Sequence, residues 1–431
     1  MDGRSPAIPR VVIVGGGLAG LAAAAALGSL GFRVDLHEAR PFLGGRATSF
    51  PLSPSREDSE RIDNCQHVLL RCCDNLLDFY RRCGVEDKIR FYDRLYFVRP
   101  GGAVDVLAPG FLPAPFHLTG SFLRFRALPA GDRWRVARAL TALMRERHRS
   151  DLDRITMSEW LALKRMSTTA VDHFWRPILV SALNEEPDRA SALPAFQVFW
   201  QGLLGSRHSY EMGVPAVPLA DLYSAALEAR LGSGVRVHLR STVEGLDPSS
   251  GKADFYIAAV PFERVSAVAP GLDLRLERFE YSPITGIHLW YDRPLTDLPH
   301  AVLLDRTLQW LFRKSETYVQ AVVSASRSLL DRTKAEIVEM ASLELREFFP
   351  RAREAKLVRS HVVKETRATY SAVPGLEQQR PPAQTAYPNL FLAGDWTDTG
   401  WPATMEGAVR SGYRAAEGVA RAAGVDAVFL K

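Results

Sequence analysis

The sequence is poor in cysteine, and its few cysteines are not arranged as metal ligands are. Only four occur in 431 residues, all between Cys65 and Cys83, and no two of them form a C-x-x-C pair. This pattern argues against a zinc site, so no metal is expected. Reduced thiols in a cytosolic protein are the expected state of all four.

The sequence also lacks a strong charge imbalance and, with one exception, long uncharged apolar runs. The formal net charge is only +5, which favours no nucleic-acid partner and is compatible with an anionic membrane surface or phosphate group. Residues 11–31 are apolar enough for a membrane-spanning helix or a signal peptide. Their glycines instead mark a strand, a turn and a helix, so no spanning segment is expected.

A glycine-rich motif dominates what the sequence does contain. The β-branched run from Val11 to Val14 predicts a strand buried on both faces. Three glycines then form G-x-G-x-x-G, namely Gly15, Gly17 and Gly20. The first allows a tight turn, the second lets backbone approach a pyrophosphate, and the third lets the helix pack closely on the strand.

The residues after this motif complete a dinucleotide-binding unit. A helix is expected from residue 18 to about residue 30, with its N-terminal amides facing the phosphates. A second strand over 32–37 leads to Glu38, whose carboxylate suits ribose hydroxyls and would repel a 2′-phosphate. The expected nucleotide contacts here are Leu18, Ala19, Glu38, Ala39 and Arg40.

The next segment favours a flavin over a nicotinamide cofactor. Gly44-Gly45-Arg46 resembles the segment that continues the dinucleotide motif in FAD-dependent amine oxidases and carotenoid desaturases. Two glycines bring backbone close to the cofactor, and Arg46 supplies a fixed cation for a phosphate.

A second strand–turn–helix unit lies near the C-terminus. After an apolar run, Asp395 is placed to accept hydrogen bonds from ribityl hydroxyls. A helix starting at about Thr404 would direct its amides at the electron-rich side of a flavin. The expected flavin contacts in this unit are Gly394, Asp395, Pro402, Ala403, Thr404 and Met405.

Together these motifs resemble the phytoene-desaturase and amine-oxidase superfamily of FAD proteins over essentially the whole chain. Within it, the chain most resembles the squalene-associated desaturases, or hydroxysqualene dehydroxylases. The closer likeness is carried by residues 63–70, 182–184, 288–292, 309–312, 364–375 and 400–407. Cys65 departs from that family, in which glycine is expected. No lysine lies between Glu280 and Tyr291, where amine oxidases usually hold one near the flavin N5.

The resemblance implies an α/β fold with a Rossmann-like FAD-binding domain of the glutathione-reductase type and an inserted substrate domain with a mixed sheet and helices. The FAD-binding domain is expected over 1–70, 210–262 and 385–431, with Val243 and Ala259 near the nucleotide by resemblance alone. Residues 71–209 and 263–384 are expected to bind substrate. Further helices are expected at 74–83, 156–164 (with Ser158 as candidate cap), 196–204, 219–231 and 334–349, and strands at 284–291, 310–313, 319–324 and 359–366.

The implied reaction is reductive removal of an allylic hydroxyl from a long-chain isoprenoid, turning hydroxysqualene into squalene. An acid protonates the hydroxyl, water leaves, and reduced FAD delivers hydride to the allylic cation inside an apolar, aromatic cavity. Asp63 or His67 is the expected acid, because a carboxyl buried beside an apolar substrate holds its proton. The alternatives are that Asp63 or Asn64 caps the next helix and that His67 is a core histidine. The electron donor, for example an NADPH-linked reductase, and the oligomeric state stay open.

Residues 111–148 raise a membrane hypothesis. An apolar, proline-rich loop precedes an arginine-dense helix expected over 132–148, a combination by which monotopic proteins enter a membrane surface. Peripheral contact with the inner face of the cytoplasmic membrane is therefore expected. The alternative is a helix with one face in the core and solvated arginines.

Three other functions remain open on the same fold. The chain could desaturate a carotenoid precursor with an external electron acceptor. It could be an amine or protoporphyrinogen oxidase, or a non-catalytic protein that binds prenyl lipids. The intact motifs at both flavin-contacting ends favour retention of FAD.

Overall fold

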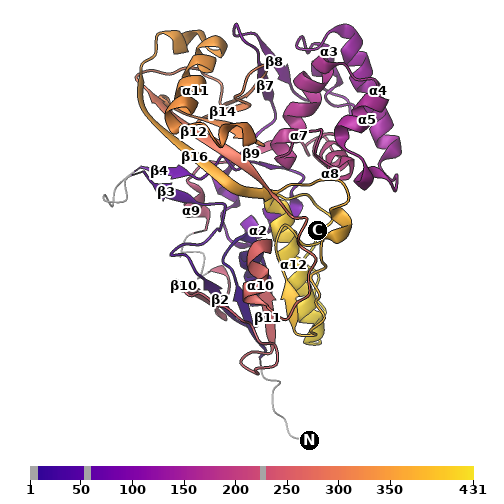
Figure 1. Cartoon of the computed structure of the whole chain (residues 1–431), viewed down its shortest axis with the longest axis vertical. Coiled ribbons are helices and arrows are strands. Elements are labelled where there is room, and N and C mark those ends of the chain that lie inside the picture. Colours follow the sequence, from indigo (N-terminus) through magenta and orange to yellow (C-terminus); the bar gives the residue numbers. More distant parts are fainter. Residues whose placement is uncertain (1–7, 53–59, 224–229) are drawn as a thin grey trace, which may run out of the picture.

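Two large sheets of different character organise the chain (Figure 1). The computed structural model describes residues 8–52, 60–223 and 230–431. The expected helix over 219–231 falls partly outside these residues, and its described part is the single turn α9 (Leu219–Leu222).

Among the described residues, five parallel strands form the first sheet, called the parallel sheet below, in the order β10-β2-β1-β11-β17. Its central strand β1 is buried at Val11 and Ile13 on one face and at Val14 on the other, as expected for a strand covered on both faces. The strands are β1 (Arg10–Val14), β2 (Arg33–Glu38), β10 (Val235–Leu239), β11 (Phe255–Ala258) and β17 (Leu390–Leu392). They come from the three segments expected to form one discontinuous domain, whose limits stay a prediction.

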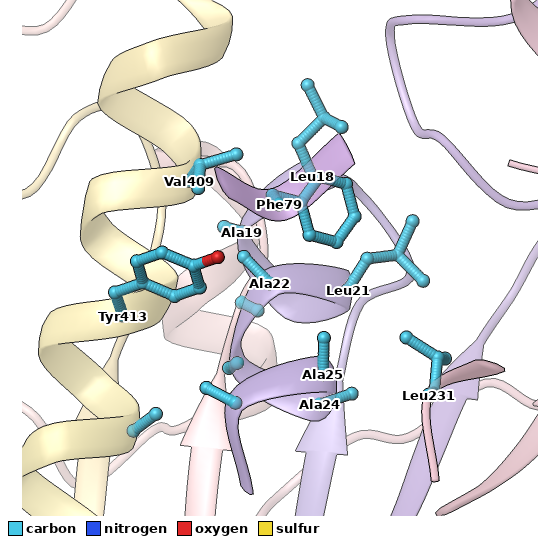
Figure 2. Close-up of a cluster of buried hydrophobic side chains, with 14 of the residues drawn as sticks. Leu18, Ala19, Leu21, Ala22, Ala24, Ala25, Phe79, Leu231, Val409 and Tyr413 are labelled. Carbon is cyan, nitrogen blue, oxygen red and sulfur yellow. The ribbon is translucent and has the colours of Figure 1, made fainter. Parts of the chain in front are cut away.

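Helices from opposite ends of the chain pack against each other on the parallel sheet. Helix α1 (Leu18–Ser29) is buried from Leu18 to Leu27, and α12 (Met405–Ala422) lies directly beside it (Figure 2). The alanine run of α1 permits this approach. At Gly412 of α12, a Cβ would lie 2.2 Å from the carbonyl oxygen of Ala19, so the contact requires glycine.

Helix α2 (Asp74–Arg82) packs into the same core, although residues 71–209 were expected on the substrate side. Its apolar residues face α1 and α12, because the helix is strongly amphipathic. The backbone amides of Asn75 and Leu76 at its start donate to the carboxylate of Glu406, the second residue of α12. Burial raises the pKa of Glu406, which is 1% exposed.

Seven strands of the described chain form the second sheet, called the mixed sheet, in the order β16-β12-β15-β14-β13-β7-β8. Helix α11 (Lys334–Phe348) covers one face, where Ile337, Ala341 and Leu345 join a closed apolar core. The strands are β7 (Leu95–Val98), β8 (Val104–Leu107), β12 (Tyr281–Tyr291), β13 (His300–Leu303), β14 (Trp310–Arg313), β15 (Tyr318–Ser324) and β16 (Leu357–Tyr370). The expected strands here are confirmed, β16 being longer than the pattern indicated.

A helical region packs beside the mixed sheet around a core of aromatic rings that includes Trp160, Trp175 and Phe199. Thr156, not Ser158, caps the helix that follows it, because its hydroxyl and Glu159 form a reciprocal capping box. The helices are α3 (Thr119–Leu123), α4 (Ala130–Glu146), α5 (Met157–Leu163), α6 (Thr168–Ala170), α7 (Arg176–Leu183) and α8 (Ala192–Gln197), with π-helical turns at Val171–Trp175 and Val198–Leu204.

Short elements connect these bodies. A ribbon of β3 (Ser49–Pro51) and β4 (Arg61–Asp63) precedes a small sheet in the order β5-β9-β6. The latter comprises β5 (Leu69–Leu70), β6 (Ile89–Tyr92) and β9 (Met212–Pro215), and α10 (Val265–Val268) follows β11. Within the part of the chain that the structure describes, no helix is both long and apolar enough to cross a bilayer.

Replacing Gly412 with alanine should destabilise the protein by about 1–3 kcal/mol, because the added methyl overpacks the α1–α12 contact. Gly131 in α4 is the control, since a Cβ there meets only the far end of Arg135 at 3.9 Å. Gly131→Ala should be neutral or stabilising. Urea unfolding of the two variants measures the difference, and equal stabilities would show that the close approach is not required.

Candidate active site

The glycine turn over residues 15–20 lies against the turn at Gly44 and Gly45, at the carboxyl end of the parallel strands. Gly15 has a φ of +112°, and a Cβ at Gly20 would lie 1.9 Å from its carbonyl oxygen. A Cβ at Gly17 would instead meet only Gly45, at 4.0 Å. The amide of Gly44 donates to the carbonyl of Gly16 at 2.9 Å. The first and third motif glycines therefore serve packing, whereas Gly17 faces open space.

The start of α1 is suited to a phosphate. Its N-cap, Gly17, has no side chain to accept from the helix amides, and no side chain of the described residues caps the amides of Leu18 and Ala19 in its place. Such free amides at the positive end of a helix form an anion site. The open space beside Gly17 leaves these amides accessible to a pyrophosphate.

Glu38 lies at the end of β2, as expected. Its carboxylate accepts from the amide of Gly16 at 2.7 Å and from the amide of Arg40 at 2.8 Å. These bonds orient the carboxylate beside the glycine turn. Ala39 lies between Glu38 and Arg40 in the chain. On the other side, Ala259 donates to the carbonyl of Val14 at 2.8 Å, while Val243 packs partly buried against the neighbouring apolar cluster.

The C-terminal unit meets the N-terminal one through an ion pair. Arg46 Nη2 donates to Asp395 Oδ1 at 2.7 Å, and Nη1 donates to the carbonyl of Ala368 at 2.8 Å. Burial alone would lower the pKa of Arg46, but the Asp395 carboxylate outweighs it and raises that pKa. The guanidinium expected to serve a phosphate thus also joins three parts of the chain, and a third of its side chain stays exposed.

The start of α12 also follows a glycine turn after a strand of the parallel sheet, but unlike the start of α1 it has a side-chain cap. Gly394 donates its amide to Ser411 at 2.8 Å, which fixes the turn after β17. The hydroxyl of Thr404 caps α12 by accepting from the amide of Gly407 at 3.1 Å. Pro402 and Ala403 form the approach to this helix, whose first residue is Met405.

A buried arginine that the sequence did not reveal holds the loop between these points. Arg380 has no exposed side-chain surface. Its guanidinium donates to the backbone carbonyls of Asp395, Thr397 and Trp401 at distances from 2.6 to 3.0 Å. It therefore positions the loop that carries Asp395. No spacing or motif distinguishes it from the many surface arginines.

The loop over residues 63–67 lies between the two large sheets. Neither Asp63 nor Asn64 caps α2, which begins at Asp74. Asp63 Oδ1 accepts from the Ser49 hydroxyl at 2.7 Å and the Leu219 amide at 3.0 Å, and Oδ2 accepts from Lys314 Nζ at 3.0 Å. Both oxygens of the Asp63 carboxylate are therefore held by donors from three other segments of the chain.

Lys314, the second residue that sequence reasoning missed, comes directly after β14. Besides binding Asp63, its ammonium donates to Gln66 at 3.1 Å. It thereby ties the mixed sheet to the loop. A lone lysine after a strand carries no signal in a sequence, so only the fold could identify it.

His67 has one engaged and one free ring nitrogen. Its Nδ1 lies 2.9 Å from the carbonyl of Cys65, which can only accept, so Nδ1 carries the proton. Burial lowers the pKa of His67, and the Cys65 carbonyl and Asp63 oppose this only in part. The imidazole is therefore neutral near pH 7, and Nε2 has no partner among the described residues.

Cys65 occupies a backbone position that does not require glycine. Its backbone φ is not positive, so a side chain is accommodated without strain, and its thiol lies close to Gly286 of β12. Burial raises the pKa of this thiol, which argues against a reactive thiolate. The departure from the expected glycine changes what borders Gly286 rather than the path of the loop.

The glycine turns, the carboxylate at β2 and the second helix start define a dinucleotide-binding flavoprotein. Gly17 leaves room for a pyrophosphate, and two helix starts offer amides, so the residues fit FAD. In agreement, the family profile of flavin-containing amine oxidoreductases matches residues 18–420. The chain belongs to this family and is an FAD-dependent oxidoreductase of the amine oxidase and desaturase superfamily.

Curated relatives are carotenoid desaturases. The 15-cis-phytoene desaturase of Synechococcus elongatus is 24% identical, covering 95% of this chain and 95% of its own. The zeta-carotene desaturase of Zea mays is 27% identical, covering 95% and 83%.

Solved structures share the fold. A putrescine oxidase has a TM-score of 0.72 at 18% identity, covering 96% of this chain and 99% of its own. A cyclohexylamine oxidase of Brevibacterium oxydans has a TM-score of 0.69 at 19% sequence identity, covering 96% of this chain and 99% of its own. The expected fold class and cofactor are thereby confirmed.

Gly17→Val should yield a folded protein without FAD, because its Cβ would have only Gly45 within 4.0 Å and its methyl groups would occupy the space left for the pyrophosphate. Gly20→Val is the matched contrast and should lose the fold, since its Cβ collides with backbone at Gly15. Flavin absorbance of the purified proteins and thermal unfolding separate the two effects. Full flavin content in folded Gly17→Val would contradict the assignment of the space beside Gly17 to the pyrophosphate of FAD.

Proposed function

We propose that the protein reductively removes the allylic hydroxyl of a long isoprenoid, converting hydroxysqualene to squalene. FAD, when bound and reduced, supplies the hydride for this chemistry. The chain's own residues would bind the isoprenoid, exclude water and deliver the proton that lets the hydroxyl leave.

An apolar cluster beside the loop over 63–67 is the observation that carries the proposal. It joins β5 and β9 to the mixed sheet through the buried residues Met212, Phe312 and Val322. Around them, large apolar side chains remain partly exposed although they lie between elements, namely Val68, Leu70, Leu95, Val214, Ile284 and Trp310. Apolar surface with a single polar border suits a long hydrocarbon that bears one functional group.

Absence of a lysine on the central strand supports an isoprenoid over an amine. At the middle of β12 the residue facing the loop over 63–67 is Gly286. The desaturase relatives, which match over most of their length, are named for isoprenoid substrates. They equally support a second candidate, desaturation of a carotenoid precursor with oxidised FAD.

For the proton, we propose His67, with Asp63 positioning the loop. Asp63 is engaged by three donors, whereas His67 keeps a free nitrogen. A histidine whose pKa is lowered is seldom protonated near neutrality, but its protonated form is a stronger acid. The rate of dehydroxylation should therefore rise as the pH falls from 8 towards 6.

The decisive test is an anaerobic single turnover. The flavin of purified protein is reduced, hydroxysqualene is added, and flavin absorbance and squalene are followed together. Reoxidation with squalene formation is the expected result, and His67→Ala should abolish the rise in rate at lower pH. Flavin that stays reduced in folded protein would contradict the dehydroxylase, and oxidised enzyme with phytoene would then test the desaturase. An Asp63→Asn/His67→Ala double variant with full rate would reject both residues as acids.

We also propose that residues 111–148 contact the inner face of the cytoplasmic membrane. Large apolar side chains in and beside this region are exposed by 58–90%, namely Phe111, Phe116, Leu123, Trp134 and Leu163. Trp134 lies in the first turns of α4 and is exposed to solvent. Arg133 links the region by donating from α4 to the carbonyl of Leu123 at 2.7 Å. Exposed aromatic residues next to arginines are typical of membrane-surface segments.

A Phe111→Ser/Trp134→Ser variant should bind anionic phospholipid vesicles at least about tenfold more weakly, since two large apolar side chains no longer insert. Leu343→Ser is the control, because Leu343 is also exposed but lies on α11. Sedimentation with vesicles measures the binding. Equal losses in both variants, or none in either, would refute a dedicated membrane surface.

A further inference from the structure

Two adjacent cysteines lie in the turn that leads into α2. Cys72 and Cys73 are each partly exposed, whereas Cys65 and Cys83, the other two cysteines of the chain, are buried. A small reagent in solvent can therefore reach the first pair of thiols more readily than the second.

The side chains of the adjacent cysteines also contact each other. A hydrogen bond joins Cys72 to Cys73, and this contact, together with burial, raises the pKa of the Cys73 thiol well above its ordinary value. Cys73 therefore keeps its proton near neutral pH and can donate it towards the Cys72 sulfur. This makes Cys72 the nucleophile and Cys73 the thiol that resolves it, an arrangement typical of redox-sensitive cysteines.

The start of α2 connects this pair to the start of α12. Cys73 is the N-cap residue of α2, but in the described part of the chain its side chain accepts no amide of the helix. The amides of Asn75 and Leu76 instead donate to the carboxylate of Glu406, at 3.3 and 2.7 Å. Glu406 belongs to the first turn of α12, one of the two helix starts that fit FAD. A shift of the backbone at Cys73 is thereby passed to a helix that faces the flavin site.

We propose that Cys72 and Cys73 form a modification site for hydrogen peroxide, and that their oxidation to a disulfide weakens the binding of FAD. The Cys72 thiolate attacks one peroxide oxygen and the O–O bond breaks, which leaves a sulfenic acid on Cys72 and a hydroxide that takes a proton to become water. The Cys73 sulfur then attacks the sulfenic sulfur, the S–S bond forms, and the hydroxyl leaves with the Cys73 proton as a second water. The two electrons lost by the thiols reduce the peroxide.

Closing this disulfide requires the backbone to move. The Cα atoms of adjacent residues lie about 3.8 Å apart across a trans peptide bond, whereas disulfides usually join Cα atoms about 4.4–6.8 Å apart. The ring formed by Cys72 and Cys73 is therefore strained, and strained disulfides are easily reduced. The strain shifts the turn before α2, and it suits a reversible response rather than permanent stabilisation.

The test treats the reduced holoenzyme with a small excess of hydrogen peroxide and follows its thiols, its mass and its FAD. Wild-type protein should lose two of its four thiols and the mass of two hydrogen atoms, with the new bond mapped to residues 72–73. The dissociation constant of FAD should rise at least about fivefold, the effect of disturbing one hydrogen-bonded contact. Dithiothreitol should restore both the thiols and the affinity.

Two variants separate the steps of the oxidation. Cys73→Ser should stop at the sulfenic acid of Cys72, which dimedone traps, and peroxide should not change its affinity for FAD. Cys72→Ser lacks the nucleophile and should show neither the disulfide nor the loss of affinity. Cys83→Ser is the matched control, because Cys83 lies at the other end of α2 and is only 1% exposed. It should respond as the wild type does, and thermal unfolding checks that all three variants are folded.

Several results would overturn the inference. One is a wild-type protein that keeps all its thiols, and another is oxidation that reaches Cys65 or Cys83 before the adjacent pair. A disulfide between Cys72 and Cys73 that leaves the affinity for FAD unchanged would overturn it as well. Because the assay contains no isoprenoid and requires no turnover, its result is independent of the reaction proposed above.

Discussion

The ion pair between the partly exposed Arg46 and the buried Asp395 is the contact on which the rest of the site depends. It joins residues 349 positions apart, and through Ala368 it also holds the edge strand of the mixed sheet. An ion pair removed from water gains little net stability by itself. Its value here is geometric, because it sets the two helix starts and the loop over 63–67 in one place.

The mixed sheet divides its two faces between stability and chemistry. The face under α11 is a closed apolar core, as strand alternation requires. The opposite face carries His288, Gln320 and Gly286, with unsatisfied polar atoms inside the protein. Unsatisfied buried polar groups reduce stability, so the apolar face under α11 contributes more to the stability of the sheet than the opposite face does.

The nucleotide-binding half could be predicted closely, because glycine spacing and strand–helix periodicity are local signals. The roles of Gly15, Gly17 and Gly20 follow from such spacing, and the structure separates them sterically as expected. Arg380 and Lys314 could not be predicted, since each acts through partners on other segments of the chain. The helix cap at Thr156 was not predicted, because Ser158 is also a hydroxyl residue near the start of that helix. Glu159 lies three positions after Thr156 and completes a capping box only with Thr156.

The parallel sheet has a consequence for how the protein is made. Helix α1 has almost no polar face, and its cover, α12, begins at Met405. During synthesis the N-terminal unit must therefore wait for nearly the entire chain before its apolar surface is buried. Such long-range closure slows folding and exposes the nascent chain to aggregation. The two helix starts that face the flavin site therefore come together only after α12 has been synthesised, so the flavin can be fully enclosed only from that point on.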